Sequence, residues 1–215
     1  HSVEWAFFMK KFEILSNETV WDGFFRMNRL RIRHSSFRGG WCEPVVRERL
    51  EGLAAVSVLL FDPDTDELVL VEQFRTGLVG RADPPWCLET VSGFCDREHE
   101  SVESVARREV EEETGCVLQA LTLVGEFFVS PGFSTETITL YCGRVDSTQA
   151  DGVHGLASEG EEIRVVRLDR QAALDALFKR VNSTSLLIGL QWLEAHRGSL
   201  ISEWSKQTGA VAPPD

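Results

Sequence analysis

Three glutamates with helical spacing are the residues in this chain best suited to chemistry. Glu109, Glu112 and Glu113 lie three and four positions apart, a spacing that places their carboxylates on one face of a helix. Because like charges so arranged repel each other, a bound divalent cation is the natural compensation. Magnesium suits such a cluster, since it prefers carboxylate oxygens together with the phosphate oxygens of a substrate. Alternatively, the glutamates form a solvated acidic face balanced by Arg107 and Arg108.

A helix that could carry these glutamates is indicated by local signals. Apolar residues recur near helical spacing over residues 101–114, Ser101 is of a type that caps helix starts, and Gly115 is of a type that ends helices. We therefore expect a helix there. Upstream, apolar runs at 54–61 and 68–74 are joined by a turn rich in Asp and Pro, which predicts a buried hairpin.

Short β-prone runs and further helical patterns fill the rest of the chain. An early group of strands, expected to form a small antiparallel sheet, is predicted at 11–14, 26–34 and 45–50. Later strands are predicted at 121–129, 136–145 and 163–168, and helices at 170–178 and 183–196. Strands flanked by helices predict an α/β or α+β sandwich. The polar stretch from 146 to 162 is longer than most connections in compact domains, which indicates a functional or a mobile loop.

Composition bounds the size of the fold and the kind of partner. The chain has 215 residues with 43% apolar content, which suffices for one full core in a domain of about 150 residues plus an accessory piece. Its net charge of −12 excludes the broad electrostatic attraction on which proteins that bind nucleic acids or anionic membranes depend. We therefore expect a small-molecule partner and, if that partner carries phosphate, cations at the site.

Cysteine usage and hydropathy indicate the compartment. The five cysteines are odd in number and include no Cys-x-x-Cys pair, which favours reduced thiols in the cytoplasm. No apolar run approaches the roughly 20 residues that a membrane span needs, and the start of the chain lacks the pattern of a signal sequence. We expect a cytoplasmic protein in which residues 1–8 are an upstream segment and residues 207–215 a flexible tail.

The glutamate helix belongs to a longer pattern. Gly93, Glu100 and the run Arg-Glu-Val-Glu-Glu-Glu-Thr-Gly-Cys from Arg108 to Cys116 resemble the Nudix box, GX5EX7REUXEEXGU, in which U is aliphatic. Six residues rather than five separate Gly93 from Glu100, and Cys116 occupies the last U position. The extra residue falls in the loop before the helix, where an insertion costs little, and cysteine is a small hydrophobic residue.

The resemblance extends over nearly the whole chain after Met9 and is most similar to the bacterial ADP-ribose pyrophosphatase type of Nudix hydrolase. Pro131, fifteen residues past Cys116, resembles a proline that marks those enzymes, although an ordinary turn proline would look the same. Further runs that resemble this type lie at 21–25, 71–75, 86–89, 159–164 and 190–193.

The resemblance implies a fold and a domain organisation. It implies an α+β protein with a Nudix α/β/α sandwich and mixed sheet at residues 53–206, preceded by a small N-terminal antiparallel β accessory domain at 9–52. In the resembling enzymes the N-terminal sheet exchanges across a two-fold axis, which implies a homodimer with composite active sites. Neither nucleic acid nor a membrane is an expected partner.

The resemblance also implies metal and catalytic roles. Its implied metal ligands, for two or three Mg²⁺ ions with Mn²⁺ as a substitute, are the Ser92 carbonyl, Glu109, Glu113 and Glu161. The implied catalytic residues are Glu159 as general base, Glu112 beside the metals, and Arg108, which pairs with Glu100. Alternatively, Glu159 and Glu161 are solvated loop charges.

The residues implied to bind substrate come from several segments. Arg75 would meet a pyrophosphate with its planar guanidinium, Phe24 would stack on adenine, and Glu136 would accept hydrogen bonds from ribose hydroxyls. Arg75 is otherwise an ordinary strand-end arginine, and Phe24 a core or interface aromatic. The full implied set is Phe24, Arg47, Glu51, Arg75, Gly93, Phe94, Ser130, Pro131, Gly132 and Glu136. Those implied to shape the box are Gly93, Glu100 and Gly115.

The reaction that the resemblance implies is hydrolysis of the pyrophosphate bond of ADP-ribose to AMP and ribose 5-phosphate. One alternative is the same chemistry on GDP-mannose or another sugar nucleotide. A second is a sensor that binds ADP-ribose without hydrolysing it, whose expected signature is loss of a metal glutamate. Glu109, Glu112 and Glu113 are all present, which favours an enzyme.

Overall fold

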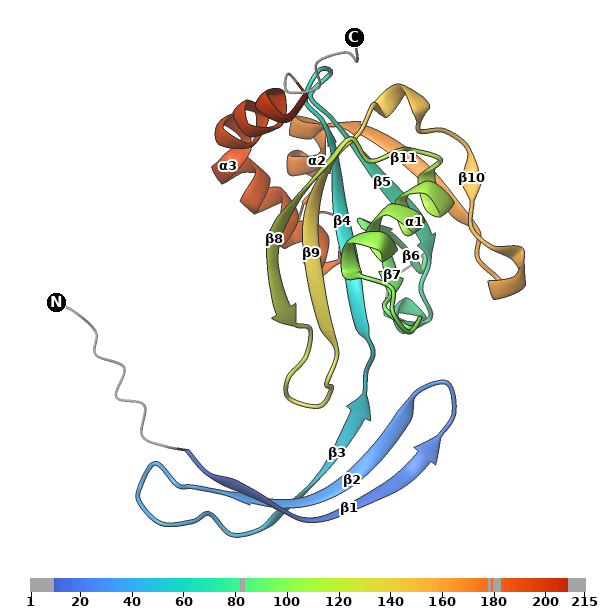
Figure 1. Ribbon diagram of the computed structural model, residues 1–215. Helices are drawn as coiled ribbons and strands as arrows, with labels where there is room; N and C mark the ends of the chain where they lie inside the picture. Colours follow the sequence, from blue (N-terminus) through green and yellow to red (C-terminus); the bar gives the residue numbers. More distant parts are fainter. Residues whose placement is uncertain (1–9, 82–83, 178, 180–182, 209–215) are drawn as a thin grey trace, which may run out of the picture. The chain divides into compact units, whose positions relative to one another are not determined.

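The computed structural model describes residues 10–81, 84–177, 179 and 183–208. These residues form two compact units, each described here by itself (Figure 1). The first, called the N-terminal unit, combines the chain up to residue 53 with residues 128–137. The second, called the sandwich unit, combines residues 54–127 with the chain from residue 138 onward.

The N-terminal unit is a three-stranded antiparallel sheet in the order β1-β2-β3, as predicted. Its strands are β1 (Phe12–Asp22), β2 (Arg26–His34) and β3 (Val45–Glu51). The expected end of the first strand at residue 14 is wrong, because β1 continues to Asp22 across two shifts of register that interrupt the alternation of apolar residues. The loop of residues 128–137 lies beside β3, where the Leu50 N–H donates to the Phe133 carbonyl at 2.8 Å.

The sandwich unit contains a sheet of eight strands in the order β10-β11-β5-β4-β9-β8, with β6 paired to β5 and β7 paired to β4, among the residues described. The bounds are β4 (Ala54–Asp62), β5 (Glu67–Phe74), β6 (Trp86–Glu89), β7 (Val91–Phe94), β8 (Ala120–Phe128), β9 (Thr137–Arg144), β10 (Val153–His154) and β11 (Ile163–Asp169). The sheet is mixed. The pairs β4–β5 and β4–β7 are antiparallel, whereas the Val145 N–H donates to the Phe61 carbonyl where β9 and β4 both end, so these two strands run parallel.

The helices of the sandwich unit are α1 (Val102–Thr114), α2 (Arg170–Ala176) and α3 (Thr184–Thr208), with short 3-10 turns η1 (Thr76–Leu78), η2 (Ser147–Gln149) and η3 (Ala157–Glu159). Helix α1 begins and ends as predicted. The Ser101 hydroxyl accepts a hydrogen bond from the Ser104 N–H at 3.1 Å, and Gly115 ends the helix in the left-handed conformation with φ 70°. The expected helix at 170–178 ends earlier, at Ala176, and Phe178 lies outside the described residues.

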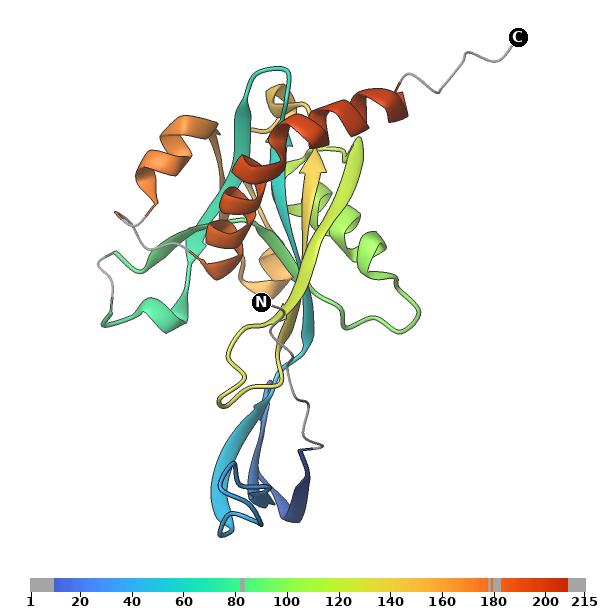
Figure 2. The same ribbon diagram turned by 90° about the vertical axis from the view of Figure 1, so that its left-hand side faces the viewer.

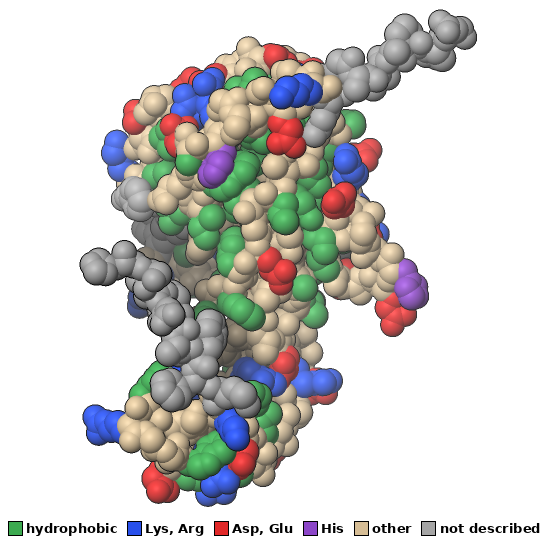
Figure 3. Space-filling view, turned by 60° about the vertical axis from the view of Figure 1, so that its left-hand side comes forward, with side chains coloured by type: hydrophobic (Ala, Val, Ile, Leu, Met, Phe, Trp, Pro, Cys, Tyr) green, Lys and Arg blue, Asp and Glu red, His purple; other side chains and the backbone are tan. Residues whose placement is uncertain are grey.

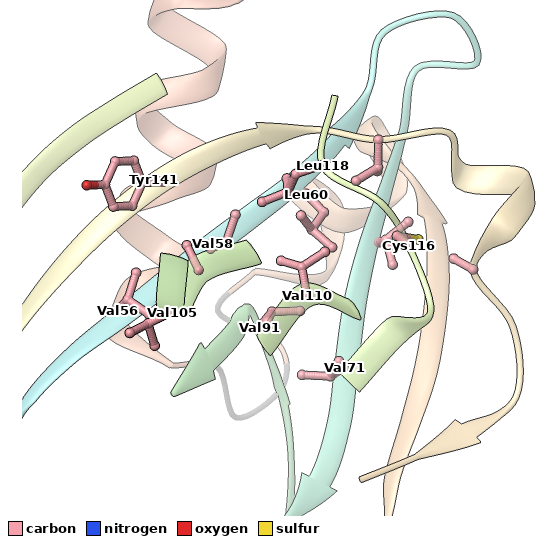
Figure 4. Packing of buried hydrophobic residues seen from close by; sticks show 14 of the residues in the cluster. Val56, Val58, Leu60, Val71, Val91, Val105, Val110, Cys116, Leu118 and Tyr141 are labelled. Atoms are coloured by element: carbon pink, nitrogen blue, oxygen red, sulfur yellow. The ribbon is translucent and has the colours of Figure 1, made fainter. Parts of the chain in front are cut away.

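The central strands are buried on both faces, which gives the unit two cores. Val56, Val58 and Leu60 of β4 pack with the apolar face of α1, as Figure 4 shows, whereas the alternating Leu59 and Phe61 pack with α2 and α3. Helix α1 therefore covers one face of the sheet and α3 the other (Figure 2). The predicted α/β/α sandwich with a mixed sheet is confirmed.

Helix α3 is longer than the sequence pattern indicated. Its expected end at His196 is wrong, since the helix continues to Thr208. Trp204 is fully buried, its ring lies 6.5 Å from that of Phe61, and its Nε1 donates to the Thr122 hydroxyl at 2.9 Å. These tertiary contacts stabilise a polar stretch whose own pattern is weakly helical.

Two further sequence expectations can be compared with the structure. None of the five cysteines, all of which lie in the described part of the chain, forms a disulfide. In the part of the chain that the structure describes, no helix combines the length and the apolar character that a bilayer crossing requires.

Replacement of Trp204 by alanine should lower the free energy of unfolding by about 3 kcal/mol or more, because it leaves a large cavity between α3 and the sheet. Urea denaturation followed by circular dichroism measures this loss. Trp86→Ala is the matched control, since that side chain is 48% exposed and should cost about 1 kcal/mol or less. Equal losses in the two variants would show that the end of α3 does not contribute to the core.

Candidate active site

The site is built where α1 lies against β7. Gly93 on β7 is paired with Val56, whose side chain faces α1. A Cβ atom at Gly93 would lie 2.1 Å from the Glu109 carboxylate, so any side chain there would displace that glutamate. The glycine that sequence analysis singled out therefore lets the helix bring its carboxylates onto the strand.

A buried hydroxyl cluster supports β7 from the other side of the sheet. The Ser57 hydroxyl of β4 shares hydrogen bonds with those of Thr90, at 2.6 Å, and Ser92, at 3.0 Å. Ser57 and Thr90 are fully enclosed, so their polar atoms depend on these bonds. Sequence reasoning missed Ser57 and Thr90, because each pairs with residues distant in the chain.

Arg108 joins three carboxylates of the site. Its Nε donates to Glu100 at 3.2 Å, and its Nη1 donates to Glu109 at 2.8 Å and to Glu112 at 3.1 Å. Burial would lower the pKa of Arg108, but the surrounding carboxylates outweigh it and raise the pKa. Arg108 therefore remains charged and holds the loop before α1 onto the helix, the pairing with Glu100 that the sequence predicted.

Glu113 is the most buried carboxylate of the site. Glu113 is 4% exposed, and its Oε2 atom is buried with no hydrogen-bond partner among the described residues. Burial, followed by the charges of Glu109 and Glu161, raises the pKa of Glu113 to about 9. A hydrogen bond from the Ser92 backbone and the charge of Arg75 act in the opposite direction. An unpartnered buried carboxylate oxygen is costly unless a cation or a proton reaches it.

Glu109 has the same character in a milder form. Burial raises its pKa, Arg108 lowers it, and the charge of Glu112 raises it again. Glu161 also contributes to this repulsion. The α1 carboxylates and Glu161 therefore lie close enough to act on one another.

The extra residue between Gly93 and Glu100 is accommodated in a turn. His99 adopts the left-handed conformation with φ 70°, and the Glu100 N–H donates to the Arg97 carbonyl at 3.3 Å. A non-glycine residue in this conformation is uncommon. Because Glu100 still reaches Arg108, the insertion leaves the geometry of the box intact.

The loop of residues 151–162 brings Glu161 to the site. Gly155, with φ 100°, lies so close to Glu161 that a Cβ there would be 2.9 Å from the Glu161 Cβ. This second close approach of a glycine to a site glutamate was also missed, since one glycine in a polar loop carries no distinctive signal. Glu159, the predicted base, has its backbone in η3, and its side chain lies outside the described residues.

Three of the residues predicted to bind substrate, Gly93, Arg75 and Phe94, lie in the sandwich unit near these carboxylates. Arg75, directly after β5, forms an ion pair with Glu89 at 2.7 Å and is near enough to Glu113 to lower its pKa. Phe94 is the last residue of β7, next to Gly93, and is 36% exposed. The positions of Arg75 and Phe94 are compatible with contact to a ligand held by α1 and β7.

The other residues predicted to bind substrate lie in the N-terminal unit. Arg47, Pro131 and Gly132 line one groove of about 210 Å³ between the sheet and the loop of residues 128–137. Ser130 starts the turn beneath them, where its carbonyl accepts from the Ser134 N–H at 2.9 Å. Phe24 lies at the β1–β2 turn, is 81% exposed and stacks edge-on against Phe25, apart from this groove's lining.

Glu51 and Glu136 complete the predicted set in the N-terminal unit. Glu51 accepts hydrogen bonds from Asn28 at 2.7 Å and from Arg49 at 2.5 Å. Glu136 lies against Gly52, where a Cβ would be 2.6 Å from the Glu136 Cβ. The loop and β3 thus bring these two carboxylates into one region of the unit.

The donor set of the sandwich unit is suited to a hard cation. Carboxylate oxygens are the ligands that magnesium and similar ions prefer. The buried Glu113 Oε2 accepts no hydrogen bond from any described residue, so it can accept a cation instead. Among the described residues, no three His, Cys, Asp or Glu side chains stand close enough to hold an ion without adjustment. Glu109 would have to exchange its bond to Arg108 for the cation.

Comparison with known proteins agrees with this geometry. The NUDIX domain model matches residues 52–184. An ADP-ribose pyrophosphatase of Escherichia coli (strain K12) is 41% identical over 194 residues, covering 90% of this chain and 92% of that protein. A GDP-mannose pyrophosphatase of Enterobacter sp. (strain 638) is 26% identical over 190 residues, covering 86% and 95%. A solved structure of an ADP compounds hydrolase has the same fold, with TM-score 0.65 at 22% identity over 86% of this chain and 96% of that one.

The family match includes both Gly93 and the whole of α1, the two elements that form the carboxylate site. The relative from Escherichia coli extends the match over nearly the whole chain. The resemblance found in the sequence is therefore confirmed, and this chain belongs to the Nudix family of hydrolases.

Proposed function

We propose that this chain hydrolyses the pyrophosphate bond of ADP-ribose, giving AMP and ribose 5-phosphate, with Mg²⁺ at the α1 carboxylates. The observation that carries the proposal is the buried Glu113 carboxylate, whose Oε2 has no partner among the described residues and which is crowded by Glu109 and Glu161. A cation bound there satisfies all three side chains. Glu112 lies beside them, held by Arg108.

The metal ligands proposed are the Glu109, Glu113 and Glu161 carboxylates and the Ser92 carbonyl. Two or three Mg²⁺ ions, or Mn²⁺ in their place, would neutralise the charge of the pyrophosphate and make the attacking water more acidic. Each proposed side chain offers oxygen, which suits these hard ions.

The remaining chemistry is proposed for side chains around that cluster. Glu159 on the 151–162 loop accepts the proton of a water that attacks the adenosyl-side phosphorus. The bond between that phosphorus and the bridging oxygen breaks, and the bridging oxygen leaves with ribose 5-phosphate. Arg75 donates to the pyrophosphate with its planar guanidinium. Arg108 keeps Glu100 and Glu112 in place.

We propose ADP-ribose rather than GDP-mannose as the substrate because of the relatives that the chain resembles more. The relative named ADP-ribose pyrophosphatase is 41% identical, whereas the one named GDP-mannose pyrophosphatase is 26% identical. In the proposed enzyme Phe24, Arg47, Glu51, Phe94, Ser130, Pro131, Gly132 and Glu136 contact the nucleotide or the terminal ribose. We place this activity in the cytoplasm, which the lack of a disulfide among the five cysteines supports.

The chain is further proposed to act as a homodimer, with an accessory domain at 9–52, a catalytic domain at 53–206 and composite active sites. The N-terminal sheet exposes large apolar side chains, including Phe12 at 72% and Ile14 at 50%. Figure 3 shows apolar side chains among charged ones on one side of this unit. Apolar surface of this kind, beside a groove that contains Arg47, fits contact with a second copy.

Glu113→Gln should lower kcat/KM for ADP-ribose by about 100-fold or more, since it removes a proposed metal ligand. The measurement is steady-state hydrolysis with Mg²⁺ of ADP-ribose, ADP-glucose, GDP-mannose, NADH and diadenosine polyphosphates. Glu111→Gln is the matched control, because Glu111 is exposed on the same helix, and it should leave the rate unchanged.

Each other outcome of this panel has a definite meaning. Preference for another sugar nucleotide would keep the chemistry and replace the substrate. Tight binding of ADP-ribose without turnover would make the chain a sensor. In the same assay Glu159→Gln should lower kcat at saturating Mg²⁺, whereas Glu161→Gln should raise the Mg²⁺ concentration needed for half-maximal rate; a reversal would exchange the two proposed roles.

Without metal, the stability of the protein should fall as pH rises. The pKa of Glu113 is raised from 4.5 to about 9 in the folded state. Because the unfolded chain releases this proton above pH 4.5 and the folded one near 9, unfolding becomes easier across that window. Glu113→Gln removes this term and should stabilise the metal-free protein by on the order of 2 kcal/mol near pH 8.

Melting temperatures in EDTA at about pH 5.5 and 8.5 test this linkage. Glu109, whose pKa is also raised, should leave part of the slope in the Glu113→Gln variant. Glu111→Gln should retain the full slope of the unaltered chain. A slope in Glu113→Gln as steep as in the unaltered chain would show that Glu113 is ionised in the metal-free fold.

Sedimentation equilibrium should give the mass of a dimer, and Ile14→Asp should shift it toward the monomer. Ile14 lines the groove, and a charge there opposes burial against a second copy. Val46→Asp is the matched control, since Val46 is 54% exposed. Ile14 pairs with Ile32, and Ile32 pairs with Val45, so these three side chains share one face of the sheet. Val46, the next residue after Val45, faces the opposite side. A monomer in the unaltered chain would remove the composite site from the proposal.

A further inference from the structure

Glu89 has no role in the site described so far, although it is bound to Arg75. Arg75 donates from Nε at 2.8 Å and from Nη2 at 2.7 Å to the same Glu89 oxygen, Oε2. The Glu89 side chain is 13% exposed and that of Arg75 is 43% exposed. The buried member is therefore the carboxylate, and the arginine extends from it toward solvent.

The strand register places this pair on the same face of the sheet as α1. Glu89 is paired with Val71 across β6 and β5, and Val71 packs in the core beneath α1, as Figure 4 shows. Cross-strand partners project from the same face. Arg75 is four residues past Val71 with extended backbone, φ −127° and ψ 115°, so its side chain also projects from that face.

This arrangement directs the guanidinium. Both bonds to Glu89 use the edge formed by Nε and Nη2, so the Nη1 side of the planar group faces away from Glu89. Arg75 is near enough to Glu113 to act on its charge. The remaining donors of Arg75 therefore project away from Glu89 on the face of the sheet that α1 covers, where an anion held by cations at the α1 carboxylates would be found.

We propose that Glu89 is a positioning residue that fixes the Arg75 guanidinium so that its Nη1 side meets the phosphate groups of the substrate. The inference rests on the proposed function, because it requires a pyrophosphate at the α1 carboxylates. Fixing one rotamer of a long side chain in advance removes an entropy cost from substrate binding. A displacement of about 1 Å in such a contact can lower the rate by about 100-fold.

A merely structural ion pair has a different signature, and the same sheet offers one for comparison. Glu72 lies next to Val71 on β5, its side chain is also 13% exposed, and it binds Arg164 of β11. Because Glu72 is paired with Leu88, which packs in the core on the α3 side, it projects from the opposite face. Glu72→Gln is therefore a control matched in burial and chemistry, on the strand next to that of Glu89.

The experiment compares Glu89→Gln, Arg75→Gln, the double variant and Glu72→Gln in steady-state hydrolysis of ADP-ribose with Mg²⁺. Glu89→Gln should lower kcat/KM by about 10-fold to 100-fold. If Glu89 acts through Arg75, the double variant should be no slower than Arg75→Gln alone. Glu72→Gln should match the unaltered chain.

A measurement without turnover tests the positioning itself. In ¹⁵N NMR of the intact, metal-free protein, the Arg75 Nε–H resonance, assigned by its loss in Arg75→Gln, should be sharp in the unaltered chain and in Glu72→Gln. In Glu89→Gln it should exchange with solvent and broaden. Melting temperatures of Glu89→Gln and Glu72→Gln should agree within a few degrees, which separates positioning from stability.

The outcomes separate this inference from the proposed function. Unchanged kcat and KM in Glu89→Gln, or losses that add in the double variant, would overturn the positioning role while hydrolysis stands. An Arg75 resonance that stays sharp in Glu89→Gln would overturn it as well. Absence of hydrolysis in the unaltered chain would instead overturn the proposed function.

Discussion

The carboxylates of this site can lie together because one guanidinium binds three of them. Arg108 reaches Glu100, Glu109 and Glu112 from the middle of α1, and these carboxylates keep it charged although burial lowers its pKa. Without that cation, the loop before the helix would lose its attachment and the helix would present unscreened like charges. Glu113 is not among the carboxylates that Arg108 binds. When Glu113 is ionised, its negative charge must therefore be balanced by a cation from outside the protein.

The rest of the sandwich unit holds α1 against β7. Val105, Ala106 and Val110 are fully buried against the sheet, which fixes the rotation of the helix and so the direction of its glutamates. On the strand, Gly93 provides the space that Glu109 occupies. Apolar packing on one side of the helix thus supports the polar arrangement on the other, and a shift of the core would be transmitted directly to the site.

How much could be predicted from the sequence depended on the distance over which each signal acts. Helix α1 was predictable because its cap, its stop and its apolar spacing are local, and the box around it fixed Gly93, Glu100 and Arg108. The end of α3 was not, since Trp204 is held by Phe61 and Thr122, far away in the chain. Glu89 could not be given a role from the sequence, because its pairing with Val71 depends on the register between two strands that are distant in the chain.

Glu113 couples the fold to the proposed activity through a single proton. In the metal-free protein, burial and neighbouring charges favour its neutral form, which stabilises the fold but cannot bind a cation as a carboxylate. Cation binding therefore requires loss of that proton, so affinity for the cation rises with pH while the stability of the metal-free fold declines. Replacing Glu113 by a neutral residue would stabilise the metal-free fold but would remove a ligand of the cation. The site consequently keeps a destabilising carboxyl because only its ionised form can hold the cations that let a negatively charged pyrophosphate approach.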